Sequence, residues 1–231
     1  MSYLLDLLYL ALPETCAACG RALQQHEPVI CLLCEYEMPK TNFHLSPIEN
    51  PIAKRFWGQT QIEAATSFYY FSQGSLVQEL IHNLKYNGRT DVGLYMGQLF
   101  GMALANAAPF KDVDLILPVP LHHQKKLMRG YNQSAVLAQG LAEAMQKKHN
   151  EDLLVRTQNS ESQTRKTREQ RLDNTQGVFA TPKPDALKDK HVLLVDDVIT
   201  TGATLSQCAN ALLQVEGLRV SLASIACTSF A

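Results

Sequence analysis

The sequence carries almost no net charge, because its 21 lysines and arginines are matched by 22 aspartates and glutamates. That balance excludes a polycation that binds nucleic acid or a membrane over its whole surface. Long hydrophobic runs are also missing: the apolar residues 92–105 number 14, short of the ~20 that a bilayer-spanning helix needs. The apolar residues 1–12 lack a basic n-region and a cleavage site, which favours a short helix over a signal peptide. We therefore expect a cytoplasmic protein without membrane insertion, in which cysteines stay reduced.

Segments typical of strands alternate with segments typical of helices over most of the chain. The apolar strand segments, such as residues 192–195, read as continuous runs, as in strands that are covered on both faces. This order predicts an α/β fold with a mainly parallel sheet flanked by helices. The expected strands cover residues 64–71, 113–117, 153–155, 192–195 and 220–226, and the expected helices cover 76–84, 92–107, 134–147 and 204–215.

Three parts are expected along the chain. Residues 1–40 form a small cysteine-containing domain that begins with a short helix. Residues 41–62 contain prolines and little periodicity, which is typical of a connector. Residues 63–231 form the α/β domain.

Four of the six cysteines fall in the first 34 residues, as two CxxC pairs with 11 residues between them. Two residues between thiols let one tight turn aim both sulfurs at one point, so two pairs can build a closed tetrahedral cage. The pattern predicts structural Zn²⁺ held by Cys16, Cys19, Cys31 and Cys34. Disulfides, bound iron and a cage that has lost its metal are the alternatives. Cys208 and Cys227 lie in apolar patterns and are expected in the core.

Residues 192–204 combine a buried strand, two adjacent carboxylates, a small hydroxyl-rich turn and the start of a helix. A turn that opens a helix presents unpaired N–H groups and a positive dipole end, which favour phosphate. Asp196 and Asp197 do not suit that phosphate and are better matched to sugar hydroxyls or to Mg²⁺ carried by a polyphosphate. The predicted phosphate contacts are Thr200, Thr201, Gly202, Ala203 and Thr204.

This segment resembles the phosphoribosyl pyrophosphate (PRPP)-binding motif of the type I phosphoribosyltransferases. It lacks the lysine of a Walker A loop and the three glycines of a dinucleotide-binding fingerprint. The resemblance implies that Asp196 and Asp197 hold the ribose 2′- and 3′-hydroxyls and that residues 200–204 cradle the 5′-phosphate. The implied reaction displaces pyrophosphate at the anomeric carbon through a cation-like transition state. Thr200 stands where hypoxanthine-type enzymes carry an aspartate, which disfavours 6-oxopurine salvage.

Positive charge is concentrated in the middle of the chain. Residues 121–171 hold ten Lys and Arg against five Asp and Glu, whereas the remainder holds 11 against 17. A solvated face is one interpretation, and a surface for pyrophosphate or nucleic acid is the other. The candidate contacts are Lys125, Lys126, Arg129, Arg165, Arg168 and Arg171, and Arg129 joins the two aspartates as a candidate catalytic residue. His122 and His123 are interpreted as surface histidines rather than metal ligands.

The order of motifs resembles the ComF family of late-competence proteins, in which a zinc ribbon is fused to a phosphoribosyltransferase domain. The shared motifs are the two CxxC pairs, residues 84–89 (LKYNGR), 118–120 (PVP) and 129–133 (RGYNQ), and the Asp196–Asp197 segment. Some relatives carry more cysteines, which affects the shape of the ribbon.

The resemblance implies a role in the uptake of single-stranded DNA, with the DNA-translocating ATPase of the competence machinery as a partner. A PRPP-dependent transferase acting on an unidentified nucleobase or amine in nucleotide metabolism is the alternative, and a PRPP-sensing regulator is a third possibility. Type I transferases are commonly dimers, so a homodimer is expected by analogy. The acceptor and catalytic turnover itself stay open.

Overall fold

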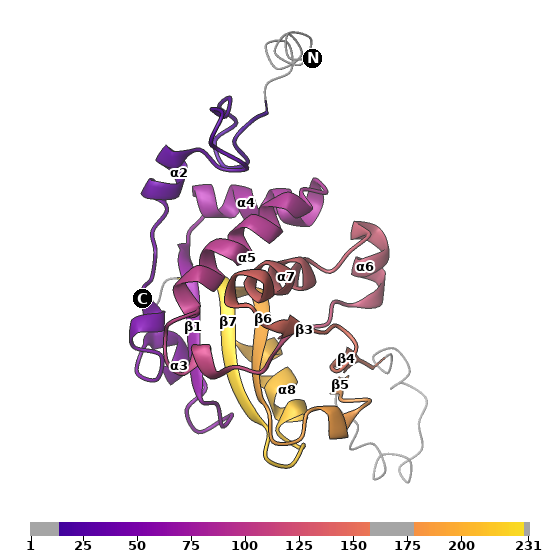
Figure 1. The fold of residues 1–231 in the computed structure, drawn as a ribbon. Helices are drawn as coiled ribbons and strands as arrows, with labels where there is room; N and C mark the ends of the chain where they lie inside the picture. The colour runs from indigo at the N-terminus through magenta and orange to yellow at the C-terminus, as the bar shows by residue number, and fades with distance from the viewer. Residues whose placement is uncertain (1–13, 158–177, 229–231) are drawn as a thin grey trace.

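The computed structural model describes residues 14–157 and 178–228 (Figure 1). The expected helix within residues 1–12 and the candidate contacts Arg165, Arg168 and Arg171 lie outside the described residues.

A five-stranded parallel sheet forms the centre of the molecule, which confirms the predicted α/β class. Its strand order is β1-β7-β6-β2-β3. The strands span Ala64–Phe71 (β1), Leu115–Pro118 (β2), Lys148–His149 (β3), His191–Ile199 (β6) and Arg219–Thr228 (β7). Because β6 and β7 are covered on both faces, nearly all their side chains are buried, as their largely apolar sequences predict.

Helices α4 (Leu76–Tyr86), α5 (Thr90–Leu104) and α7 (Gln133–Met145) cover one face of the sheet (Figure 1). Glycines let α5 and α7 approach closely, since a Cβ atom on Gly140 would overlap the Leu94 carbonyl oxygen and one on Gly97 would overlap the Leu137 carbonyl oxygen. This close packing places the first turn of α7 beside the sheet.

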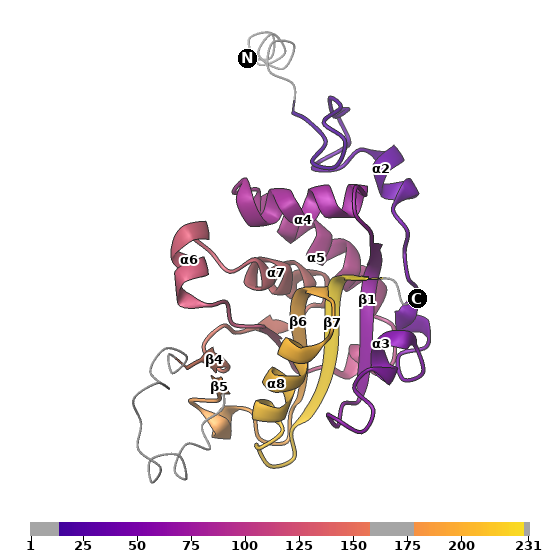
Figure 2. The same ribbon diagram turned by 180° about the vertical axis from the view of Figure 1, so that it is seen from behind.

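The other face carries α8 (Ala203–Leu212), α3 (Pro51–Lys54) and the 3-10 turn η1 (Phe43–Leu45), as the view from behind shows (Figure 2). Residues 41–62, expected as a connector, supply the buried side chains Phe43, Ile52 and Phe56 to this layer. Asn50 begins α3 by accepting hydrogen bonds from the Ile52 and Ala53 N–H groups, and its amide donates to the Ala65 carbonyl of β1. The segment is therefore tied directly to the sheet.

Shorter elements complete the described chain. They are α2 (Leu32–Glu37), η2 (Phe110–Asp112), α6 (His123–Arg129), η5 (Pro184–Ala186) and the two-stranded antiparallel pair β4 (Val155–Arg156) and β5 (Phe179–Ala180). The strand expected at 153–155 thus begins at Val155 and pairs outside the main sheet, while Leu153 and Leu154 are buried in the preceding loop. Over residues 14–157 and 178–228, no helix combines the length and apolarity that crossing a membrane requires.

Candidate functional site

The two adjacent aspartates lie inside β6, which continues to Ile199, and do not follow the end of that strand as the sequence suggested. The neighbouring strand β2 stops at Pro118, which is paired with Val195, and the Val119 N–H then donates to the Val195 carbonyl at 2.8 Å. Asp196 therefore begins the part of β6 that extends beyond its β2 partner. In open parallel sheets, ligands bind at this carboxyl edge.

Each aspartate is held by a different helix on the same face of the sheet. The Ser134 hydroxyl, in the first turn of α7, donates to Asp196 Oδ1 at 3.0 Å. Lys85 Nζ, at the end of α4, lies 2.7 Å from Asp197 Oδ2, and both side chains are largely buried (21% and 8% exposed). Burial and the neighbouring Asp197 carboxylate raise the pKa of Asp196 to about 7. The two carboxyl groups are therefore held by a hydrogen bond and an ion pair. A hydroxyl donor or a cation that approaches Asp196 stabilises its ionised form.

The stability of the ligand-free protein should decrease through Asp196 as the pH rises. Because the pKa of Asp196 is raised, the native state binds more protons than the unfolded chain between pH 4 and 7, so the free energy of unfolding falls across that window. Asp196→Asn removes this titration and should be the more stable protein at pH 8, by roughly 2 kcal/mol. Urea denaturation at pH 5, 6.5 and 8 measures the difference, which should grow with pH.

The control is Asp185→Asn, which changes an exposed carboxylate in η5. A difference between Asp196→Asn and wild type that stays constant from pH 5 to 8, as for the control, would contradict the raised pKa.

The threonine-rich loop connects β6 to α8 and is shaped by two residues from the 41–62 segment. Gly202 is the N-cap of α8 with a φ of 82°, and it offers no side chain to cap the helix. The Arg55 guanidinium donates to the Thr200 carbonyl, and a Cβ on Gly202 would come within 3.1 Å of the Phe56 ring. A small hollow of about 30 Å³ lies within the loop, lined by Asp196 and residues 198–205. The Ala203 N–H donates to the Thr201 hydroxyl at 3.4 Å, and no side chain of the N-cap residue caps α8, so the start of this helix borders a hollow of the kind that favours an anion.

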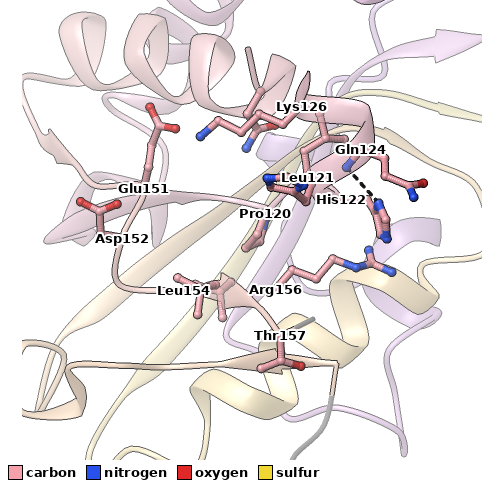
Figure 3. Close-up of a pocket in the computed structure, with 13 residues that line it drawn as sticks. Pro120, Leu121, His122, Gln124, Lys126, Glu151, Asp152, Leu154, Arg156 and Thr157 are labelled. Atoms are coloured by element: carbon pink, nitrogen blue, oxygen red, sulfur yellow. Dashed lines mark hydrogen bonds between the residues drawn. The ribbon is translucent and has the colours of Figure 1, made fainter. Parts of the chain in front are cut away.

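A larger pocket of about 450 Å³ lies between α6 and residues 151–157 (Figure 3). Glu151 and Asp152 lie at one end of this pocket, and His122 and Arg156 lie at the other. Asn132 joins it to the acid pair, because its amide donates to the Val119 carbonyl and its Oδ1 accepts from Ser134 N. The remaining lining residues are Pro120, Leu121, His123, Gln124, Lys126, Leu154, Val155 and Thr157. His123 is exposed and His122 half-buried, in line with the sequence interpretation, and both also line this pocket.

A second cavity of about 340 Å³ lies on the other side of α6, next to Lys85. The Arg129 guanidinium lies over the Tyr86 ring, 5.2 Å from its centroid, and donates to Gln133 Oε1. Lys125 also lines this cavity, whereas Lys126 lines the larger pocket. The structure therefore brings Lys125 and Arg129 together and separates Lys126 from them.

Four cysteines at the N-terminal side form the cluster that the CxxC pairs predict. The sulfur atoms of Cys16, Cys19, Cys31 and Cys34 lie within 4.8 Å of one another, and those of Cys19 and Cys31 are 3.9 Å apart. Zn–S bonds of about 2.3 Å in a tetrahedron separate the sulfurs by about 3.8 Å, so the cage has the right size. The backbone N–H of Cys31 donates to Cys16 Sγ at 3.3 Å. All four are free thiols, and together they can hold a metal such as zinc.

The surroundings of Cys31 favour its thiolate form. Its burial raises the pKa, but hydrogen bonds from the Cys34 backbone and from the side chains of Cys34, Cys16 and Arg21 outweigh burial and bring the pKa down to about 7. Cys208 and Cys227 are fully buried in the core, as predicted.

Comparison with known proteins identifies the C-terminal part. Residues 131–228 match the model of the phosphoribosyl transferase domain. The chain is 27% identical over 202 residues to DNA utilization protein YhgH of Escherichia coli K12, covering 86% of this chain and 84% of that protein. It is 26% identical over 209 residues to competence protein ComFC of Bacillus subtilis (90% and 75% covered), and 29% identical over 147 residues to competence protein F of Haemophilus influenzae (61% and 64%).

Two solved structures match parts of this chain at low similarity. The glutamine PRPP amidotransferase of B. subtilis, complexed with ADP and GMP, is 19% identical with a TM-score of 0.42, over 61% of this chain and 30% of that enzyme. Adenine phosphoribosyltransferase of Leishmania tarentolae is 11% identical with a TM-score of 0.35, over 78% and 88%.

Proposed function

We propose that this chain, which matches the phosphoribosyl transferase domain over residues 131–228 and is similar to competence proteins, is a ComF-family protein that binds PRPP and acts in the handling of single-stranded DNA during natural competence. The observation that carries the proposal is the acid pair of β6 beside the uncapped start of α8. One short segment thus offers acceptors for a diol and donors for a phosphate. A ribose 5-phosphate carries both groups on one sugar, with the diol on the ring and the phosphate on the exocyclic C5′.

In this proposal Asp196 and Asp197 accept hydrogen bonds from the ribose 2′- and 3′-hydroxyls. Ser134 and Lys85 hold the two carboxylates in place, at 3.0 and 2.7 Å, so little reorganisation accompanies binding. The 5′-phosphate accepts hydrogen bonds from the N–H groups and hydroxyls of residues 200–204. The carboxylate oxygens are also the ligand type that Mg²⁺ takes, and Mg²⁺ carried with PRPP supplies charge neutralisation at the pyrophosphate.

Arg129 and Lys125 are the proposed contacts of the pyrophosphate, since both line the cavity beside Lys85. Lys126, in the larger pocket, contributes positive charge from the other side of α6. In the transferase alternative given below, a nucleobase or amine acceptor would displace pyrophosphate at the anomeric carbon, and the chain would position the ribose and stabilise developing charge. The four-cysteine cluster is proposed to hold structural zinc, and the location is proposed to be cytoplasmic.

Calorimetric titration of PRPP with Mg²⁺ into the full-length protein tests the binding proposal. Saturable binding at one site per chain, weakened by ribose 5-phosphate as a competitor, supports it. The absence of measurable binding at millimolar PRPP overturns it.

A separate observation, at the cavity of about 340 Å³ next to Lys85, supports DNA binding. Tyr86 and Met128 are 66% and 87% exposed, beside the cationic groups of Lys125 and Arg129. An exposed ring among cations is the arrangement on which single-stranded bases stack while phosphates meet positive charge. In the competence role the proposed partner is the DNA-translocating ATPase, and a homodimer is proposed by analogy.

Two substitutions should weaken single-strand binding in different ways. Tyr86→Ala should lower affinity roughly tenfold with little change in salt dependence, because it removes stacking. Lys125→Ala should lower the salt slope by about one, because it removes one phosphate contact. Fluorescence anisotropy with a labelled oligonucleotide between 50 and 200 mM salt measures both. Tyr36→Ala, which removes another exposed tyrosine, is the control; equal losses in all three variants would contradict a site at α6.

The alternative function is a PRPP-dependent transferase of nucleotide metabolism whose acceptor is a nucleobase or an amine. The pocket of about 450 Å³ favours it, because this pocket joins the acid pair through Asn132 and has both carboxylates and cations in its lining. Pyrophosphate release upon addition of bases, amines and DNA ends separates this alternative from the competence role.

A further inference from the structure

The last turn of α4 contacts both the four-cysteine cluster and the acid pair. The Asn83 side-chain amide donates to the Ala17 carbonyl at 2.7 Å, and Lys85 Nζ lies 2.7 Å from Asp197 Oδ2. Residues two positions apart on a helix point in different directions, so one turn can reach two sites at once. In Figure 1 the cysteine segment lies on one side of α4 and the sheet on the other.

At the cysteine end, the carbonyl that Asn83 binds belongs to the metal-holding turn itself. Ala17 lies between Cys16 and Cys19, is buried, and donates its N–H to the Val29 carbonyl at 3.0 Å. The Gly20 N–H closes the same turn on the Cys16 carbonyl at 2.9 Å. The direction of the Ala17 carbonyl therefore depends on whether this turn holds its shape. Four thiols brought together by a metal fix that shape.

At the acid end, the position of Lys85 depends on the same turn of α4. The Asn87 amide donates to Asn83 Oδ1 at 2.7 Å, and the Tyr131 hydroxyl donates to the Leu84 carbonyl. These contacts hold the turn together between the two sites. Asp197 is 8% exposed, so the cation of Lys85 decides how that carboxylate is oriented and balanced.

We propose that Asn83 and Lys85 are positioning residues of the acid pair, and that loading of the four-cysteine cluster strengthens ribose binding through them. With the cysteine turn fixed, Asn83 anchors the end of α4, and Lys85 holds Asp197 in the orientation that accepts a ribose hydroxyl. With the turn loosened, the anchor is lost and Asp197 loses its fixed partner. This inference rests on the proposed binding of PRPP and adds its regulation by metal.

Thermodynamic coupling is reciprocal, so ribose binding must also stabilise the loaded cluster. The test uses the full-length protein purified with zinc and measures its zinc affinity by equilibrium competition with a chromogenic chelator, with and without saturating PRPP and Mg²⁺. PRPP should raise the zinc affinity of the wild-type protein about tenfold. Asn83→Ala should keep stoichiometric zinc in the absence of chelator, bind PRPP about tenfold more weakly by calorimetry, and lose the effect of PRPP on zinc affinity.

Two further variants separate positioning from general destabilisation. Gln98→Ala removes a comparable amide hydrogen bond, to Glu143, on the exposed side of the same helical layer, and should behave as wild type. Lys85→Arg keeps the cation and should keep both the affinity for PRPP and the coupling, whereas Lys85→Met should lose both.

The outcomes distinguish this inference from the proposed function. Tight PRPP binding by the wild-type protein with no effect on zinc affinity overturns the inference and leaves the proposed function standing. So does an Asn83→Ala variant in which PRPP still raises zinc affinity. No PRPP binding by the wild-type protein, with zinc present, overturns the proposed function itself.

Discussion

Replacing both aspartates of β6 with asparagine should reduce PRPP affinity by at least ~100-fold, because charge-assisted hydrogen bonds to a diol are each worth about 1.5–3 kcal/mol. The amide side chains of Asp196→Asn and Asp197→Asn keep the size of the carboxylates but lose their negative charge. They also leave Lys85 without the partner that it has at 2.7 Å. Calorimetry with PRPP and Mg²⁺ measures the loss.

Folding of the double variant is checked separately from binding. Since Asp196 carries a pKa raised by burial and by Asp197, removing the acid pair should leave the fold intact at neutral pH. Asp185→Asn, which changes an exposed carboxylate, should bind PRPP as wild type does. Undiminished PRPP affinity in a folded double variant would overturn the assignment of the acid pair.

The fold was predictable from sequence because its central strands are largely apolar and covered on both faces. Residues 192–195 and 220–226 contain no alternation, and both strands are central in the sheet. The strand expected at 153–155 begins two residues later than predicted, because an apolar triplet does not distinguish a strand from a buried loop. Leu153 and Leu154 are such buried loop residues.

The candidate site was predictable only where its residues are consecutive. The loop of residues 200–204 and the two aspartates form one continuous motif, and the sequence identified all of them as candidates. Lys85 and Ser134 were missed because they come from α4 and α7, which are 112 and 62 residues away along the chain from Asp197 and Asp196. No local pattern reports such contacts. The LKYNGR segment marked the neighbourhood of Lys85 without giving it a role.

The lysines of α6 are divided between two cavities, which the count of charges in the middle of the sequence did not show. Lys125 and Lys126 are adjacent in sequence but line different cavities, because neighbouring side chains on a helix diverge. Glu151 and Asp152, which form the acidic end of the larger pocket, also belong to residues 121–171. A net count over residues 121–171 therefore averages over two distinct electrostatic environments.

Loss of a cysteine ligand should unfold the N-terminal module while the sheet stays folded. The buried side chains of the two CxxC turns belong to the same hydrophobic cluster as α4 and α5 and form no separate core, and structural zinc contributes about 10–16 kcal/mol to small zinc domains at neutral pH. In Cys31→Ser, the buried residues Ala17, Ile30 and Met38 would lose the anchor that holds them on the α4–α5 layer. Limited proteolysis should then cut within residues 14–38 at least tenfold faster, and zinc content by mass spectrometry should fall from one per chain to near zero.

The matched control is Cys208→Ala, which removes a buried thiol from α8 far from the cluster. It should retain zinc and resist proteolysis within residues 14–38, because its only cost is a small cavity of about 1 kcal/mol. Chelation of the wild-type protein should reproduce the faster proteolysis of Cys31→Ser, because four thiols without a metal do not bind one another. A chelated protein that resists proteolysis as well as the loaded one would show that packing against α4, and not the metal, maintains the module.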